Sequence, residues 1–175
     1  TPTLITDGSI TITARVVDRA GNQGPLSASR VLILDTTAPV QTVAITAISD
    51  NAGTITGPIA DGAVTNDTTP SLSGTLSGAL ATADVVRVYS NGVLSGNAAV
   101  KGTNWSYTPA PALTTNGTYS FAAQVIDAAG NSGPLSTPRS IVLDTAAPTK
   151  TVAITSVSDN TDPVQGLVAA GGSTN

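Results

Sequence analysis

Short stretches of alternating apolar and polar residues recur along the chain, separated by Gly, Asn, Asp and Pro. In residues 42–48, for example, Val43 and Ile45 alternate with Thr and Ala. A period of two is the pattern of a strand that buries one face. The pattern predicts seven short strands, which are residues 42–48, 71–76, 85–90, 93–100, 104–108, 118–127 and 139–144. We therefore expect an all-β sandwich in this part of the chain.

Turn residues divide these strands at regular intervals. Asn91-Gly92 lies between two of them and predicts a tight hairpin, because both residues readily adopt a left-handed backbone. Residues 50–69 carry no strong alternation and are predicted to form one long loop. Seven antiparallel strands with this spacing are typical of an Ig-like sandwich of about a hundred residues.

The same sequence recurs after one such sandwich. Residues 1–66 align without a gap with residues 110–175, at an offset of 109, and 33 of the 66 positions are identical. A fixed period of this length predicts tandem Ig-like modules rather than the coils of a solenoid. The Asp-Thr-x-Ala-Pro segments that end at Pro39 and Pro148 are predicted to be stiff linkers between modules.

These linkers give the expected domain organisation. Residues 39–147 are predicted to be one complete module. Residues 1–38 are expected to supply the last two strands of a preceding module, and residues 148–175 the first strand and loop of a following one. Because neither end can bury a core alone, we expect the ends to pack on the complete module or on neighbouring molecules, or the chain to lie inside a longer ordered assembly.

The amino-acid composition excludes several classes of function. The chain has no Cys, Met or His, all its 11 acidic residues are Asp, and its net charge is −4. An acidic surface disfavours binding to nucleic acid. No apolar run reaches the ~20 residues of a membrane helix, so no membrane insertion is expected. No His, Cys or Glu is present to act as a base or nucleophile. Paired aspartates could carry out acid–base chemistry, but no pocket signature accompanies them, and we expect no enzymatic activity.

Most of the aspartates fall at predicted strand ends. Sandwich topology places Asp127 and Asp84 beside the linker that carries Asp35, at one end of the module. The loop 50–69 is expected at the opposite end, near Asp144, and brings the acidic residues Asp50, Asp61 and Asp67. Clustered carboxylates without basic partners repel one another. Ca²⁺, which takes about six to eight oxygen ligands, would relieve this repulsion, whereas the absence of His and Cys argues against zinc or copper.

An alternative explanation is that these residues only shape turns, since Asp and Asn side chains commonly bond to their own loop backbone. The repeat supports the calcium explanation where an aspartate recurs one period later and weakens it where the aspartate is replaced. Asp18, Asp35 and Asp50 recur one period later, whereas Asp61 is replaced by Ala170 and Asp7 by Asn116.

Several motifs together resemble the bacterial Ig-like repeats of giant adhesins, including biofilm-associated and RTX-type proteins exported by type I secretion. The motifs are Asp-Thr-Thr-Ala-Pro, Ser-Asp-Asn, Thr-Asn-Asp-Thr-Thr-Pro-Ser-Leu-Ser-Gly-Thr-Leu, Asn-Trp-Ser-Tyr and Val-Ile-Asp-Ala-Ala-Gly-Asn-Ser-Gly. The resemblance covers the whole chain. It implies an extracellular rod on the bacterial cell surface, whose modules contact their neighbours and hold an adhesive domain, located elsewhere, away from the cell.

The resemblance also implies Ca²⁺ at or near the module junctions. The ligands carried over from it are Asp35 and Asp144 in the linkers, Asp18, Asp127 and Asn131 in the loops before the last strand, and Asp50, Asp67 and Asp159 in the loops after the first strand, with Asp61 and Asp84 as further candidates.

A second function remains open, which is the binding of glycans or proteins. Trp105 and Tyr107 would stack on a sugar if both were exposed side by side. The competing expectation is that Trp105 anchors a core with few other aromatic residues. Tyr119 stands where Ig-like folds often place a tyrosine that bonds to the backbone, although its counterpart one period earlier is Ile10.

Overall fold

The computed structural model describes residues 6–161 and 165–173, and it divides into two compact units, Thr1–Thr145 and Ala146–Asn175. Strands make up all the regular structure of the described residues, and none of them belongs to a helix long and apolar enough to span a membrane. The strands of the first unit are β1 (Gly8–Ile12), β2 (Arg30–Leu34), β3 (Val43–Asp50), β4 (Gly57–Ile59), β5 (Val64–Thr65), β6 (Ser71–Leu76), β7 (Val85–Ser90), β8 (Val93–Asn97), β9 (Ala99–Lys101), β10 (Asn104–Tyr107), β11 (Gly117–Ile126) and β12 (Arg139–Leu143). The second unit holds β13 (Ser158–Asp159) and β14 (Gly166–Leu167).

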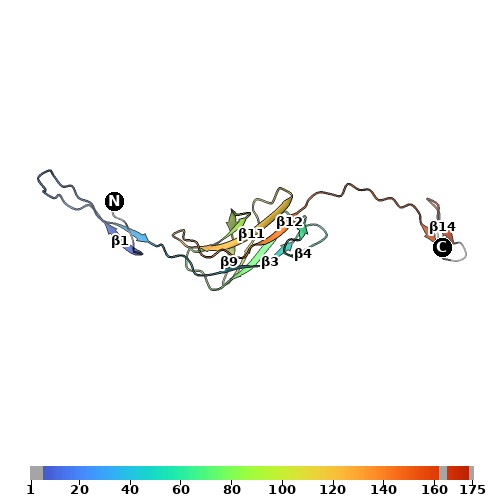
Figure 1. Cartoon of the computed structure of the whole chain (residues 1–175), viewed down its shortest axis with the longest axis horizontal. Helices are drawn as coiled ribbons and strands as arrows, with labels where there is room; N and C mark the ends of the chain where they lie inside the picture. The colour runs from blue at the N-terminus through green and yellow to red at the C-terminus, as the bar shows by residue number, and fades with distance from the viewer. Residues whose placement is uncertain (1–5, 162–164, 174–175) are drawn as a thin grey trace. The chain divides into compact units, whose positions relative to one another are not determined.

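Two five-stranded sheets, formed by β3 to β12, make the expected all-β sandwich. One sheet has the order β4-β3-β6-β10-β9 and the other the order β5-β12-β11-β7-β8. Figure 1 shows β11 and β12 in one layer and β3 and β4 in the other. Neighbouring strands are antiparallel except β5 and β12, which pair in parallel at Val64↔Val142 and Leu143↔Thr65.

The core between the sheets follows the alternation of the sequence. In β11 the buried positions include Phe121, Ala123 and Val125, each separated by one less buried residue. Trp105 and Tyr107 alternate in the same way in β10 and are 3% and 9% exposed. The expectation that Trp105 anchors the core is therefore confirmed.

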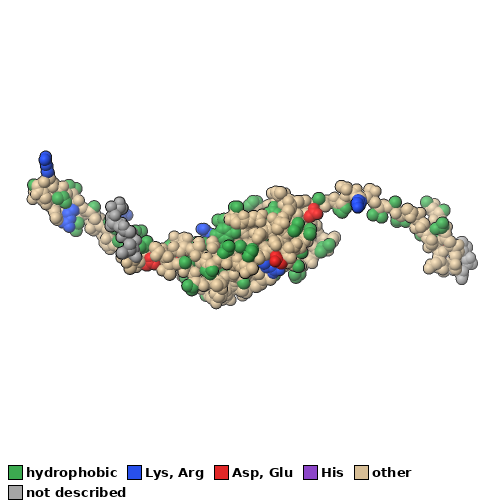
Figure 2. Space-filling view, viewed as in Figure 1, with side chains coloured by type: hydrophobic (Ala, Val, Ile, Leu, Met, Phe, Trp, Pro, Cys, Tyr) green, Lys and Arg blue, Asp and Glu red, His purple; other side chains and the backbone are tan. Residues whose placement is uncertain are grey.

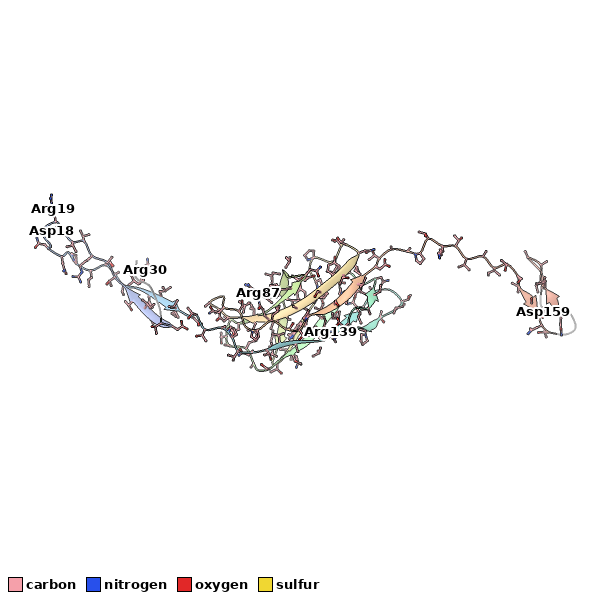
Figure 3. The ribbon with its side chains drawn as sticks, viewed as in Figure 1. Asp18, Arg19, Arg30, Arg87, Arg139 and Asp159 are labelled. Atoms are coloured by element: carbon pink, nitrogen blue, oxygen red, sulfur yellow. The ribbon has the colours of Figure 1, made fainter. Side chains whose placement is uncertain are left out.

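A β-bulge shifts the alternation of buried and exposed side chains in β3. Its pairing with β6 shifts between Ile45 and Ala47, so that Ile48 faces the core although it lies an odd number of residues beyond Ile45. The carbonyl oxygen of Thr46 in the bulge accepts a hydrogen bond of 2.8 Å from Nη1 of Arg139. Arg139, labelled in Figure 3, thereby joins the start of β12 to the opposite sheet.

The predicted Asn91-Gly92 hairpin is confirmed. Both residues have positive φ, of 50° and 78°, and β7 pairs with β8 directly across the turn. Other details of the prediction are wrong. Residues 93–100 do not form one strand. The strand pairing is interrupted at Ala98, where the chain passes from one sheet to the other, and two strands result, β8 and β9. The loop 50–69 contains the short strands β4 and β5.

The chain enters the sandwich at one end and leaves it at the other. β3 follows the linker, residues 35–39, and the loop 127–133 after β11 lies beside this linker, at what we call the entry end. β12 runs antiparallel to β11 and away from the entry end. Its first residue, Arg139, pairs with Phe121 in the middle of β11, and its last, Leu143, pairs with Gly117 at the opposite, exit end.

The segments outside the sandwich form hairpins with the same register as their counterparts within it. β1 pairs with β2 at Gly8↔Leu34, and β11 with β12 at Gly117↔Leu143, one period later. In the second unit β13 and β14 likewise repeat the pairing of β3 and β4. The predicted module boundaries stay predictions, and residues 1–5, 162–164 and 174–175 of the two partial modules lie outside the described residues.

Candidate functional site

The loop 127–133 at the entry end is organised by one carboxylate. Asp127 accepts hydrogen bonds from the backbone N–H groups of Ala129 and Asn131, at 2.9 and 2.8 Å, and from the Asn131 side-chain amide at 2.8 Å. The Asn131 side chain is the largest cause of a lowered pKa of Asp127, with backbone donors adding to it and partial burial opposing it. The carboxylate thus shapes a turn from its own loop donors.

The loop 18–24 has the same construction. Asp18 accepts bonds from Ala20 N, Asn22 N and the Asn22 side-chain amide at 2.9, 2.8 and 2.8 Å. The Asn22 side chain is again the main cause of a lowered pKa for Asp18. Figure 3 labels Asp18, beside Arg19, in the loop that connects β1 to β2.

The linker is contacted from both sides. The Asn131 side-chain amide donates a second hydrogen bond, of 3.1 Å, to the backbone oxygen of Asp35. From the side of the hairpin, the Asp7 carboxylate accepts bonds from Thr36 N, Thr36 Oγ1 and Thr37 Oγ1 at 3.0, 2.7 and 2.7 Å. The two threonines lower the pKa of Asp7. The Asp35 carboxylate itself accepts a bond from Thr37 N at 3.0 Å.

A second hydrogen-bond network lies where β3 ends. Asp67 is fully buried and accepts bonds from Asn51 N and Thr69 N at 2.9 and 2.8 Å. Asp50 accepts bonds from Ala52 N at 2.8 Å and from Thr65 Oγ1 at 2.6 Å. Since Thr65 Oγ1 also accepts the Asp67 N–H at 3.0 Å, this hydroxyl links the two aspartates.

The outgoing segment at the exit end is held like the linker at the entry end. Asn116, one period after Asp7, accepts bonds through Oδ1 from Thr145 N and Thr145 Oγ1 at 3.1 and 2.9 Å. Its amide nitrogen lies 3.4 Å from Asp144 Oδ1. Asp144 also borders a surface hollow of about 260 Å³ that Thr65 and Asn66 help to line.

Three predicted site residues lie apart from these contacts. Asp84 precedes β7, whose Val85 pairs with Ile126, so it lies near the entry end as predicted. The prediction that Asp61 accompanies Asp144 is wrong, because Asp61 accepts bonds from Ser140 N and Oγ near the start of β12. The chain turns back in β4, which carries residues 60–62 away from the exit end. Asp159 is in the second unit, where it accepts the Thr161 N–H at 2.9 Å.

Asp61 also has a basic neighbour, contrary to the expectation of carboxylates without basic partners. Its pKa is lowered mainly by the backbone N–H of Ser140, and the charge of Arg139 adds to this effect.

Comparison with known protein families gives a match that covers the sandwich. A family model described as a bacterial Ig-like domain matches residues 42–145. The chain belongs to the bacterial Ig-like domain family. The matched residues include the whole sandwich, β3 to β12, and extend only one residue beyond Asp144. No curated protein matches the chain. Ig-like domains of this kind are commonly extracellular surface modules, and their fold is typically non-enzymatic.

Within this Ig-like domain the predicted calcium ligands do not converge. Ca²⁺ needs about six to eight oxygen atoms. The carboxylates of Asp50, Asp67 and Asp127 already accept hydrogen bonds from their own loops. Among the described residues no three acidic side chains lie close enough together to hold a metal ion. These carboxylates therefore have local hydrogen-bond donors, and calcium binding stays a prediction.

The residues of the proposed sugar platform are buried instead. Because Trp105 and Tyr107 face the core of the Ig-like domain, they offer no exposed stacking surface. A surface hollow of about 460 Å³ next to Tyr107 is lined mainly by small residues, including Ser95, Gly96 and Ser106. Tyr119 bonds through its hydroxyl to the backbone of Thr115, at 3.0 Å to the oxygen and 3.2 Å from the nitrogen, as a corner tyrosine does.

Sequence reasoning missed the role of Asp7 and Asn116. Their difference looked like a failure of the repeat, yet both accept bonds from the first Thr of an Asp-Thr-x-Ala-Pro segment. The available signal was that Asp and Asn share a side-chain oxygen acceptor at the same position.

Proposed function

We propose that the chain is part of a rod of tandem Ig-like modules in a bacterial surface adhesin. Each module is an extender, and adhesion or biofilm formation depends on domains elsewhere in the protein. The observation that carries the proposal is that local structure of the complete module recurs one period away on both of its sides. The second function, glycan or protein binding, lacks the exposed aromatic pair that would favour it.

The first hairpin supports a further module on the entry side. Ile12 in β1 is 50% exposed, whereas its counterpart Phe121 is fully buried. Leu32 in β2 is 44% exposed and its counterpart Ile141 is fully buried. Figure 2 shows apolar side chains exposed on this arm. In an extender array, other strands of the same module would cover this face.

The geometry of the sandwich suits an extender. Entry and exit lie at opposite ends, so that each added module lengthens the array instead of folding it back. The Asp-Thr-x-Ala-Pro linker is short, and its proline restricts the preceding backbone.

The proposal is tested by measuring how far an array of modules holds an epitope above the cell surface. Cells would display an epitope above one, two or three copies of residues 39–147, and its height would be measured by super-resolution fluorescence. We expect the height to rise by an equal step with each copy. Gly/Ser linkers of equal length serve as controls, because flexible chains extend only with the square root of their length. A height equal to that of these controls would refute the extender role.

Calcium stiffening of the junctions is a separate proposal. Its support is that Asp127 lies in the loop beside the linker that carries Asp35, near Asp84. If Ca²⁺ binds only the folded chain, EDTA will lower the melting temperature of a calcium-loaded sample. Calorimetric titration of the metal-free chain would show heat of binding. An unchanged melting temperature together with no heat of binding would remove calcium from the account, while the extender role would stand.

A further inference from the structure

The linker, residues 35–39, makes hydrogen bonds to both of its neighbours, and none of these bonds needs a cation. Asp7 holds it from the side of the hairpin through Thr36 and Thr37. Asn131 holds it from the side of the sandwich through the backbone oxygen of Asp35. These contacts involve successive linker residues, so that little free chain remains between the two anchoring points.

Asn131 can perform this role because an amide group has two N–H donors. One is donated to Asp127 Oδ2 at 2.8 Å and fixes the side chain on its own loop. The other is donated to Asp35 O at 3.1 Å and leaves the loop for the linker. An aspartate at this position would have no donor for either bond.

Gly133 lets the linker lie against the loop. A Cβ atom at this position would be 3.0 Å from the backbone oxygen of Pro39 and 3.5 Å from its Cβ. The Cβ atom would also lie 3.4 Å from the backbone oxygen of Val125. Because the φ of Gly133 is not in the left-handed region, an added methyl group would act on these neighbours, with the shortest contact to the linker, and not on the local backbone conformation.

The chain provides its own comparison for both residues. Asn22 makes the same 2.8 Å bond to Asp18, but within the described residues its amide donates no bond to a linker. Gly24 is the counterpart of Gly133, and a Cβ there would meet only Val16 O, at 3.4 Å. The loop therefore takes its shape without a linker, and the linker contacts at 131 and 133 are additional.

We propose that the loop 127–133 is a docking site for the preceding linker, in which Asn131 is the positioning residue, and that this contact orders the module junction without a bound cation. The inference rests on the extender role proposed above, because it describes how successive modules of such a rod would be joined. It differs from calcium stiffening in assigning the order of the linker to hydrogen bonds and to packing against Gly133.

Backbone ¹⁵N relaxation of the full chain in EDTA tests this proposal through the amides of Thr36, Thr37 and Ala38. We expect order parameters near 0.85, typical of rigid backbone, in the unchanged chain. Asn131→Ala should reduce them below about 0.6, the range of flexible backbone. Asn22→Ala is the matched control and should leave them unchanged. Fluorescence of Trp105 checks that each variant keeps a folded sandwich.

Two further variants separate hydrogen bonding from cation binding and from loss of fold. Asn131→Asp should mobilise the linker in EDTA as Asn131→Ala does. Gly133→Ala should raise linker mobility, whereas Gly24→Ala should not. The proposal is overturned if Asn131→Ala leaves linker order unchanged, or if the linker of the unchanged chain orders only when Ca²⁺ is added. Neither result would affect the reach measured on cells, which tests the extender role independently.

Discussion

Gly74 lies in β6 between its partners Ile45 in β3 and Trp105 in β10, and it has no space for a side chain. A Cβ atom there would be 1.9 Å from the backbone oxygen of Ala44 and 2.5 Å from two indole carbons of Trp105. The core tryptophan and this glycine therefore depend on each other, because the indole ring occupies the volume that a larger residue at 74 would fill.

Gly74→Ala is expected to destabilise the sandwich by about 3 kcal/mol, since neither the backbone oxygen nor the packed ring can move away freely. Gly78→Ala is the matched control, because a Cβ there meets nothing within 4 Å, and it should change stability by less than about 0.5 kcal/mol. Urea unfolding followed by Trp105 fluorescence measures both. Equal midpoints for the two variants would contradict the packing described for Gly74.

Asp61 is expected to make the stability of the folded chain depend on pH, in a direction that its lowered pKa determines. Its pKa is lowered in the folded chain, chiefly by the Ser140 N–H, so its contribution is present above the ordinary aspartate value and is lost as pH falls through the folded pKa. Asp61→Asn keeps an oxygen acceptor for Ser140 but does not titrate. We expect urea midpoints of the variant to fall less steeply than those of the unchanged chain between about pH 5 and pH 3. Identical slopes would show that Asp61 takes no part.

At the level of the strands, the hairpins β1–β2 and β11–β12 have the same register but differ in burial. β1–β2 and β11–β12 pair in the same way, but among the described residues only β11–β12 lies under an opposing sheet. Register comes from local sequence and turn geometry, whereas stability comes from burial. The exposed pair keeps the register of the buried pair, as expected where local sequence and turn geometry set it.

Hydrogen exchange should separate these two hairpins within one sample. Amides of β11 and β12 should exchange only when the sandwich unfolds, while those of β1 and β2 should exchange about a hundredfold faster or more. Residue-resolved exchange by NMR gives both rates. Equal protection would mean that the apolar face of β1–β2 is covered in solution, for example by a second copy of the chain.

The sequence predicts these elements unevenly. Long alternating strands such as β11 and the Asn91-Gly92 turn were predictable, because periodicity and turn chemistry act locally. β4 and β5 were missed because strands of three and two residues carry too little alternation, and β4 contains Pro58. Topology placed Asp84 and Asp127 near the linker, but it misplaced Asp61, whose position depends on how the chain turns back in β4.

In the whole molecule, the contacts of the linkers determine how one module would be joined to the next. The family match identifies one Ig-like domain, and the repeat extends its pattern to both ends of the chain. The linker contacts of Asp7 and Asn131 recur in part at the exit end, where Asn116 holds Thr145. A rod built from this unit would repeat the same joint after every 109 residues.

Solution X-ray scattering on chains with one, two and three copies of residues 39–147 between the terminal hairpins tests this account most directly. The ten residues of β11 at about 3.4 Å each, with a linker of five residues, set an increment of roughly 40–50 Å per copy. The account predicts that the maximum dimension grows by the same increment with every added copy in EDTA. Increments that shrink with each copy, as in a flexible string of domains, would contradict it.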